Sequence, residues 1–138
     1  MANVTLDAYL SFDGTCRQAM EFYKNVFGGT LEMQTYDEVP GEMPGKAQMK
    51  GKIVHSSLRG GEITLMASDT HDKTIGTGKI ELSLSGEDEA KLREMYDGLS
   101  SGGTVRSPLE KQFWGDTFGA LTDKFGVDWM VNINAKRD

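Results

Sequence analysis

The chain has 138 residues, enough for one domain with a hydrophobic core and too few for two domains of ordinary size. Its net charge of −6 would repel nucleic acids and acidic membranes, and its basic residues are scattered, so we expect neither as a partner. Cys16 has no second cysteine to pair with, and neither a signal peptide nor a long apolar run is evident, which predicts a cytoplasmic protein.

The first half of the chain predicts a strand, a helix and three further strands. Residues 7–12 alternate apolar and polar side chains, as a strand with one face on the core does. Apolar side chains then recur at helical spacing from Cys16 to Phe27. The pair Gly28-Gly29 can end this helix, because a left-handed C-cap favours a residue without Cβ. Further strands are expected near residues 30–37, 49–58 and 62–67.

The second half of the chain repeats this order. Residues 10–14 resemble residues 82–86 at an offset of 72, and residues 28–31 resemble residues 102–105 at an offset of 74. A strand at 79–84 and a helical stripe from Leu92 to Leu99 follow the same plan. The later strands are expected near residues 104–107, 112–121 and 127–134. The sequence therefore predicts two βαβββ modules, about residues 1–70 and 76–138, within a single domain of residues 1–138. The loops at 38–48 and 68–78 are expected to be flexible, and the first could lie over a cleft or be a plain connection.

Several short stretches carry a family pattern: residues 9–14, 19–23, 54–55, 66–69, 114–116 and 123–129. In these words the chain resembles the PhnB-like (3-demethylubiquinone methyltransferase-like) branch of the vicinal oxygen chelate superfamily, which holds the glyoxalase, bleomycin-resistance and extradiol-dioxygenase proteins. The resemblance implies an α+β fold in which two βαβββ modules form curled mixed sheets around a concave cavity, with the helices outside. It also implies a homodimer.

The resemblance further implies where a metal ion would bind. Family members with metal chemistry carry four ligands, mostly His and Glu, on the first and last strand of each module. Carried over to this chain, the positions fall at about Asp7, Met66, Lys79 and Met130, with Asp7 and Lys79 as one pair of repeat mates and the methionines as the other. Thioethers are soft ligands and an ammonium group repels a cation, so we expect no metal and no cofactor here.

Strand alternation predicts which side chains face the cavity. Leu10, Phe12, Leu82 and Leu84 would lie under the helices, so their neighbours along each strand would face the opposite side. For His55, a structural role with its ring bonded to a backbone carbonyl or to Asp69 stays open. No catalytic residue is assigned. The expected ligand-binding residues are Tyr9, Ser11, His55, Met66, Glu81, Trp114 and Met130, the aromatic and Met side chains for apolar contact and the others for orienting polar groups.

These residues predict a metal-independent protein that binds a small molecule of unknown identity. The alternative is a metal-dependent lyase, isomerase or dioxygenase that uses His55 with carboxylates such as Glu62, Glu81 and Asp128, so whether the chain is an enzyme stays open. A third possibility is an interaction module whose cavity has collapsed. A methyltransferase of the usual kind would need a Gly-rich turn that begins a helix, whereas the Gly pairs of this chain follow predicted helices.

Overall fold

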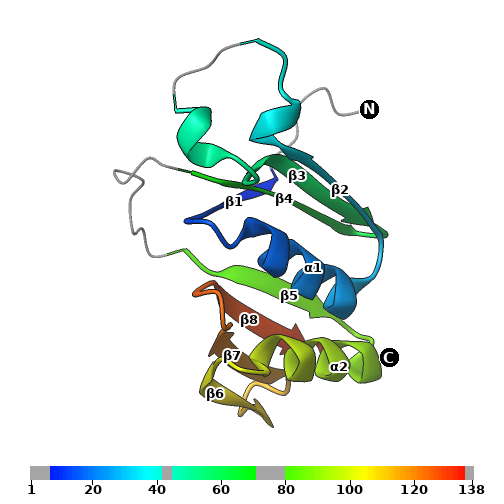
Figure 1. Ribbon diagram of the computed structural model, residues 1–138. Coiled ribbons are helices and arrows are strands. Elements are labelled where there is room, and N and C mark those ends of the chain that lie inside the picture. Colours follow the sequence, from blue (N-terminus) through cyan, green and yellow to red (C-terminus); the bar gives the residue numbers. More distant parts are fainter. Residues whose placement is uncertain (1–6, 42–44, 71–79, 136–138) are drawn as a thin grey trace. The chain divides into compact units, whose positions relative to one another are not determined.

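The computed structural model describes residues 7–41, 45–70 and 80–135. The chain divides into two compact units, Met1–Gly76 (the first unit) and Thr77–Asp138 (the second unit). Each unit holds one α-helix and one mixed sheet of four strands in an open order (Figure 1). The predicted α+β fold with two βαβββ modules is therefore confirmed, whereas the union of both modules in one domain stays a prediction.

The first unit consists of β1 (Ala8–Phe12), α1 (Cys16–Phe27), β2 (Thr30–Thr35), the 3-10 turns η1 (Tyr36–Glu38) and η2 (Ala47–Met49), β3 (Ile53–Gly60) and β4 (Ile63–Asp69). Its strand order is β1-β4-β3-β2, with β1 parallel to β4 and the other pairs antiparallel. The apolar stripe of α1 is buried on one face of this sheet, where the Cys16 thiol lies 3.5 Å from the Ser56 hydroxyl. Leu10 and Phe12 are less exposed than their neighbours in β1, as the alternation predicts.

The second unit repeats the plan with β5 (Leu82–Gly86), α2 (Glu89–Ser100), β6 (Thr104–Lys111), β7 (Thr117–Thr122) and β8 (Asp128–Ile133). Its strand order is β5-β8-β7-β6, with β5 parallel to β8. The helix buries Leu92, Met95, Tyr96 and Leu99 against its own sheet. The Asp88 carboxylate caps its first turn by accepting a hydrogen bond from the Lys91 N–H at 3.1 Å.

The boundary between the second and third strands of this unit differs from the prediction. Strands were expected at 104–107 and 112–121, but β6 runs on to Lys111 and the chain turns between Gln112 and Gly115. Pro108 lies inside β6, where its missing N–H is tolerated because β6 is an edge strand. The register between β6 and β7 shifts on both sides of Ser107, so regular alternation does not mark this strand.

Asp69 joins four elements of the first unit. It is 2% exposed, and its carboxylate accepts hydrogen bonds from the N–H groups of Cys16 (2.9 Å) and Ile53 (3.0 Å). Its backbone carbonyl accepts a hydrogen bond from the Tyr36 hydroxyl at 3.0 Å. Since a buried carboxylate needs such donors, the end of β4 fixes the starts of α1 and β3 and the position of η1.

Asp123 likewise holds the β7–β8 hairpin together by hydrogen bonds. Its carboxylate accepts hydrogen bonds from the N–H groups of Phe125 (2.8 Å) and Val127 (3.0 Å) and from the Trp129 indole (2.9 Å). Trp129 is 2% exposed, in agreement with the alternation of this strand. Among the described residues, no helix is long and apolar enough to cross a membrane.

Candidate functional site

Four of the predicted binding residues share the face of the first sheet that α1 leaves uncovered. Tyr9 lies opposite Met66 in the parallel pair of β1 and β4, and Ser11 lies opposite Ser68 two residues further on. Met66 in turn lies opposite Ser57, and His55 is two residues from Ser57 in β3. Residues two apart in a strand point to the same side, so Tyr9, Ser11, His55 and Met66 form one surface, here called the open face of the first sheet.

A contact between Tyr9 and His55 crosses this open face. The Tyr9 hydroxyl oxygen lies 3.1 Å from His55 Nδ1, and the ring centroids are 5.8 Å apart. Because β4 separates β1 from β3, the phenol ring must reach over the neighbouring strand to make this contact. Asp69, considered as a partner for His55, instead accepts hydrogen bonds from the backbone of Cys16 and Ile53.

The contact constrains what the imidazole can offer to a ligand. In neutral histidine one ring nitrogen donates and the other accepts. If the Tyr9 hydroxyl donates to Nδ1, the proton of the His55 ring is on Nε2, which then serves as a donor. Tyr9 is 48% exposed, and His55 is also exposed, so both groups can meet a molecule from solvent beside the Met66 thioether.

On the corresponding face of the second sheet, Arg106 makes several polar contacts that the sequence analysis did not predict. One Arg106 nitrogen donates hydrogen bonds to the Glu81 carboxylate at 2.8 Å and to the Leu121 carbonyl at 3.1 Å. Its Nε lies 4.0 Å from the Asp128 carboxylate, which also accepts a hydrogen bond of 2.6 Å from the Thr122 hydroxyl. The guanidinium therefore reaches from β6 across the sheet toward β5.

The remaining predicted residues of the second unit lie in two different places. Met130 is opposite Ser83, which is two residues along the chain from Glu81, and so shares the face that Arg106 crosses. Trp114 instead lies in the loop after β6, at the end of the sheet away from Glu81. It is 50% exposed, and its ring meets that of Phe113 edge-on with the centroids 4.9 Å apart.

The strand registers correct the repeat alignment behind the expected metal positions. Tyr9 lies opposite Met66, and Ser83 lies opposite Met130. If the two methionines are repeat mates, then Tyr9 corresponds to Ser83, at an offset of 74. The same offset relates the first residues of β2 and β6. The similar stretches 10–14 and 82–86 suggested an offset of 72, which differs by two residues from the offset in the structure. Because two residues are one full period of a strand, the strand faces are still assigned correctly.

The corrected alignment places two carboxylates and two thioethers at the four positions. In this alignment Glu81 takes the place of Lys79 as the mate of Asp7, and Lys79 itself lies outside the described residues. The Glu81 carboxylate is engaged by Arg106 at 2.8 Å, and thioether sulfurs are poor ligands for hard divalent metals. Within the described ranges, no three His, Cys, Asp or Glu side chains gather closely enough to hold a metal ion. The residues do not fit the metal site of the metal-dependent family members.

Comparisons with known proteins agree with the fold. The family pattern described as Glyoxalase/Bleomycin resistance protein/Dioxygenase superfamily matches residues 5–131. Protein YjdN of Escherichia coli K12 is 30% identical over 145 residues, covering 93% of this chain and 94% of its own. The crystal structure of PA1353 from Pseudomonas aeruginosa is 36% identical, with a TM-score of 0.83 over 97% of this chain and all of that one.

The PhnB protein from Bacillus cereus shares the fold, with a TM-score of 0.74 and 24% identity over 95% of this chain and 100% of its own. The expected likeness to PhnB-like proteins is thereby confirmed at the level of the fold. The chain belongs to the glyoxalase/bleomycin resistance/dioxygenase superfamily.

Proposed function

We propose that this protein binds a small organic molecule on the open face of its first sheet without the help of a metal ion. The proposal is carried by one observation, the Tyr9–His55 contact at 3.1 Å beside Met66. Small-molecule sites commonly combine apolar surface with a few placed polar groups, and this face offers both.

Each residue of the open face has a distinct proposed role. The Tyr9 ring and the Met66 thioether provide apolar contact with an adaptable shape. His55 and Ser11 orient the ligand by hydrogen bonds. Glu81, Met130 and Trp114 in the second unit stay proposed ligand contacts, each of which needs its own variant to be tested.

The competing function is metal-dependent lyase, isomerase or dioxygenase chemistry with His55 and carboxylates. It has weaker support because His55 is engaged by Tyr9, and Glu81 by Arg106. Elemental analysis of protein purified without a metal-affinity tag distinguishes the two. Near-stoichiometric metal would favour the competing function, and its absence after the supply of each first-row metal would favour ours.

The binding proposal is tested by screening a fragment library by ligand-detected NMR against the wild type and Tyr9→Ala. Hits at the proposed site should lose about tenfold in affinity in the variant, as expected for an aromatic contact worth somewhat more than 1 kcal/mol. Phe22→Ala is the matched control, since Phe22 belongs to α1, which covers the opposite side of the same sheet. If both variants affect the hits equally, the apolar contacts are unspecific and the proposal fails.

We also infer a cytoplasmic homodimer. The dimer rests on the resemblance to the family and the location on the single cysteine of the chain. Light scattering that gives the mass of one chain of 15.2 kDa would contradict the dimer. Recovery of the protein outside the cytoplasmic fraction of its cells would contradict the location.

A further inference from the structure

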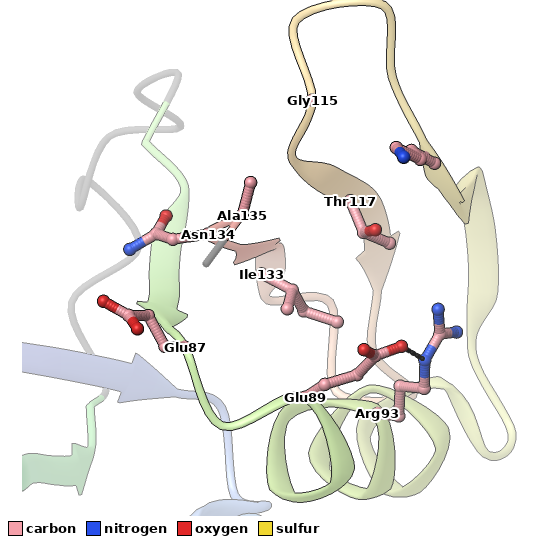
Figure 2. Close-up of a pocket in the computed structure, with 9 residues that line it drawn as sticks. Glu87, Glu89, Arg93, Gly115, Thr117, Ile133, Asn134 and Ala135 are labelled. Atoms are coloured by element: carbon pink, nitrogen blue, oxygen red, sulfur yellow. Dashed lines mark hydrogen bonds and ion pairs between the residues drawn. The ribbon is translucent and has the colours of Figure 1, made fainter. Parts of the chain in front are cut away.

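The second unit contains a hollow that is separate from the face of its own sheet that Arg106 crosses. It has a volume of about 600 Å³, within the range of about 300–1,000 Å³ that is usual for small-molecule sites. Glu89 and Arg93 of α2 line it together with Ile133 of β8, so it lies on the side of the sheet that the helix covers (Figure 2). Nothing in the proposed binding at Tyr9 and His55 depends on it.

One row of paired residues across the sheet forms the floor of this hollow, and side chains of opposite charge lie at its two ends. The row runs from Gly86 in β5 through Ile133 and Thr117 to Lys111 in β6. Glu87 follows Gly86 directly, so the acidic side chain starts from one edge of the sheet and the basic side chain from the other. Figure 2 shows Glu87 on one side of the hollow, with Ile133 and Thr117 between it and the far side.

Two of the four charged side chains around the hollow are available for a ligand. Glu89 and Arg93 form a salt bridge of 2.8 Å, so their charges largely cancel. Within the described part of the chain, neither Glu87 nor Lys111 makes a salt bridge or a side-chain hydrogen bond. The hollow therefore offers a carboxylate at one end, an ammonium group at the other, and the Thr117 hydroxyl and Ile133 side chain between them.

The spacing of the strands sets the length of a molecule that meets both charges. Four neighbouring strands span roughly 14 Å, from three intervals of about 4.8 Å. The Glu and Lys side chains shorten this span from both ends, while an extended dipeptide is about 7 Å long.

We propose that this hollow binds a zwitterion of dipeptide length. Its carboxylate meets Lys111 and the Thr117 hydroxyl, its ammonium group meets Glu87, and an apolar side chain packs on Ile133. Charge separation across the site fixes the direction in which the ligand lies, because the reverse orientation would place like charges together.

The test uses glycyl-leucine as the probe and backbone amide NMR of the full chain at low salt, since exposed charge pairs are screened by ions. Resonances of Gly115, Thr117 and Ile133 should shift on titration. N-acetyl-glycyl-leucine, which lacks the ammonium group, and glycyl-leucinamide, which lacks the carboxylate, should each bind at least about threefold more weakly, as the loss of one exposed charge pair predicts.

Variants distinguish this site from general charge attraction. Glu87→Gln should weaken glycyl-leucine about threefold and leave N-acetyl-glycyl-leucine unchanged, whereas Lys111→Gln should leave glycyl-leucinamide unchanged. Lys91→Gln and Glu94→Gln, on α2 and outside the hollow, are the matched controls and should leave the affinity for each of the three peptides unchanged. The proposal is overturned if the three resonances do not shift at about 10 mM probe. It is also overturned if the blocked peptides bind as well as the parent, or if the controls act like the test variants.

Discussion

At the scale of single residues, the Tyr9–His55 contact predicts a defined tautomer of the imidazole. If the phenol donates to Nδ1, the neutral ring carries its proton on Nε2. Nitrogen-15 NMR of the ring should then show an unprotonated Nδ1 and a protonated Nε2 in the wild type. Tyr9→Phe, which keeps the ring and removes the hydroxyl, should shift the balance toward a mixture of tautomers.

The second histidine of the chain, His71, supplies the assignment control, because His71→Gln removes its signals from the spectrum. A ring spectrum of His55 that is identical in the wild type and Tyr9→Phe would show that the hydroxyl does not bond to the imidazole. The proposed polar role of His55 would then lose its basis.

Cys16 predicts a pH dependence of stability on the alkaline side. Burial, with a smaller contribution from the charge of Asp69, raises the pKa of the Cys16 thiol from 9.0 to about 11. The folded state therefore favours the protonated thiol. This stabilisation is complete below pH 9.0 and is lost as the pH rises toward about 11, because the unfolded chain then loses the proton more easily.

Urea unfolding of the wild type and Cys16→Ala between pH 8 and 11 measures this effect. The wild type should be the more stable at the lower end, because the variant leaves a small cavity beside Ser56. Its advantage should shrink above pH 9.0. A constant difference over the whole range would show that the thiol does not titrate with unfolding.

Residue patterns could predict which face each side chain occupies but not which side chains meet. Tyr9 and His55 were both placed on the open face by alternation, yet their contact depends on the order β1-β4-β3, which places one strand between them. The sequence does not predict the contacts of Arg106, because its partners come from β7, β8 and the residue before β5, and no short stretch of sequence brings them together.

At the scale of elements, the Gly pairs after each helix have a second role besides ending it. A Cβ on Gly29 would lie 2.6 Å from the Arg59 carbonyl oxygen, and a Cβ on Gly103 would overlap that of Thr122. In both units the chain that leaves the helix therefore passes directly over the neighbouring hairpin. The sequence showed the repeat of the pair, but the helix-capping explanation accounts only for its first residue.

This close approach predicts that Gly103→Ala destabilises the protein by about 2 kcal/mol or more, since backbone must move to admit the methyl group. Gly86→Ala is the control, because its Cβ would meet only the Leu92 side chain at 3.8 Å. The control should change the free energy of unfolding by about 1 kcal/mol at most. Equal effects in urea unfolding would contradict the close approach.

The strand boundaries of the second unit show where periodicity stops being informative. β5 and β8 alternate and were located within a few residues. β6 contains Pro108 and two shifts of register, so its pattern resembles the end of a strand rather than its middle. An edge strand can hold such irregularities because only one of its sides must pair.

At the scale of the whole molecule, three aspartates in the stretches that carry the family pattern have structural roles. Asp69 and Asp123 each hold several backbone groups of their own unit. Asp116 accepts hydrogen bonds from the Ala135 N–H and the Asn132 amide. The resemblance could therefore predict the fold nearly end to end, because these three aspartates secure loops and hairpins, while the identity of the ligand stays open.

The predicted single domain can be tested with side chains that the protein already has. Cys16, the only cysteine of the chain, is fully buried in the first unit, while both tryptophans belong to the second. In Trp114→Phe the fluorescence comes from Trp129 alone, whose indole is held by Asp123. Thiol labelling and fluorescence should then give the same urea midpoint if both units unfold together.

A midpoint for Cys16 that differs from that for Trp129 would mean that each βαβββ unit melts on its own. The buried thiol would then be more than a packing group. Its rate of reaction with an alkylating reagent under native conditions would report how often the first unit opens transiently, while the indole fluorescence stays unchanged.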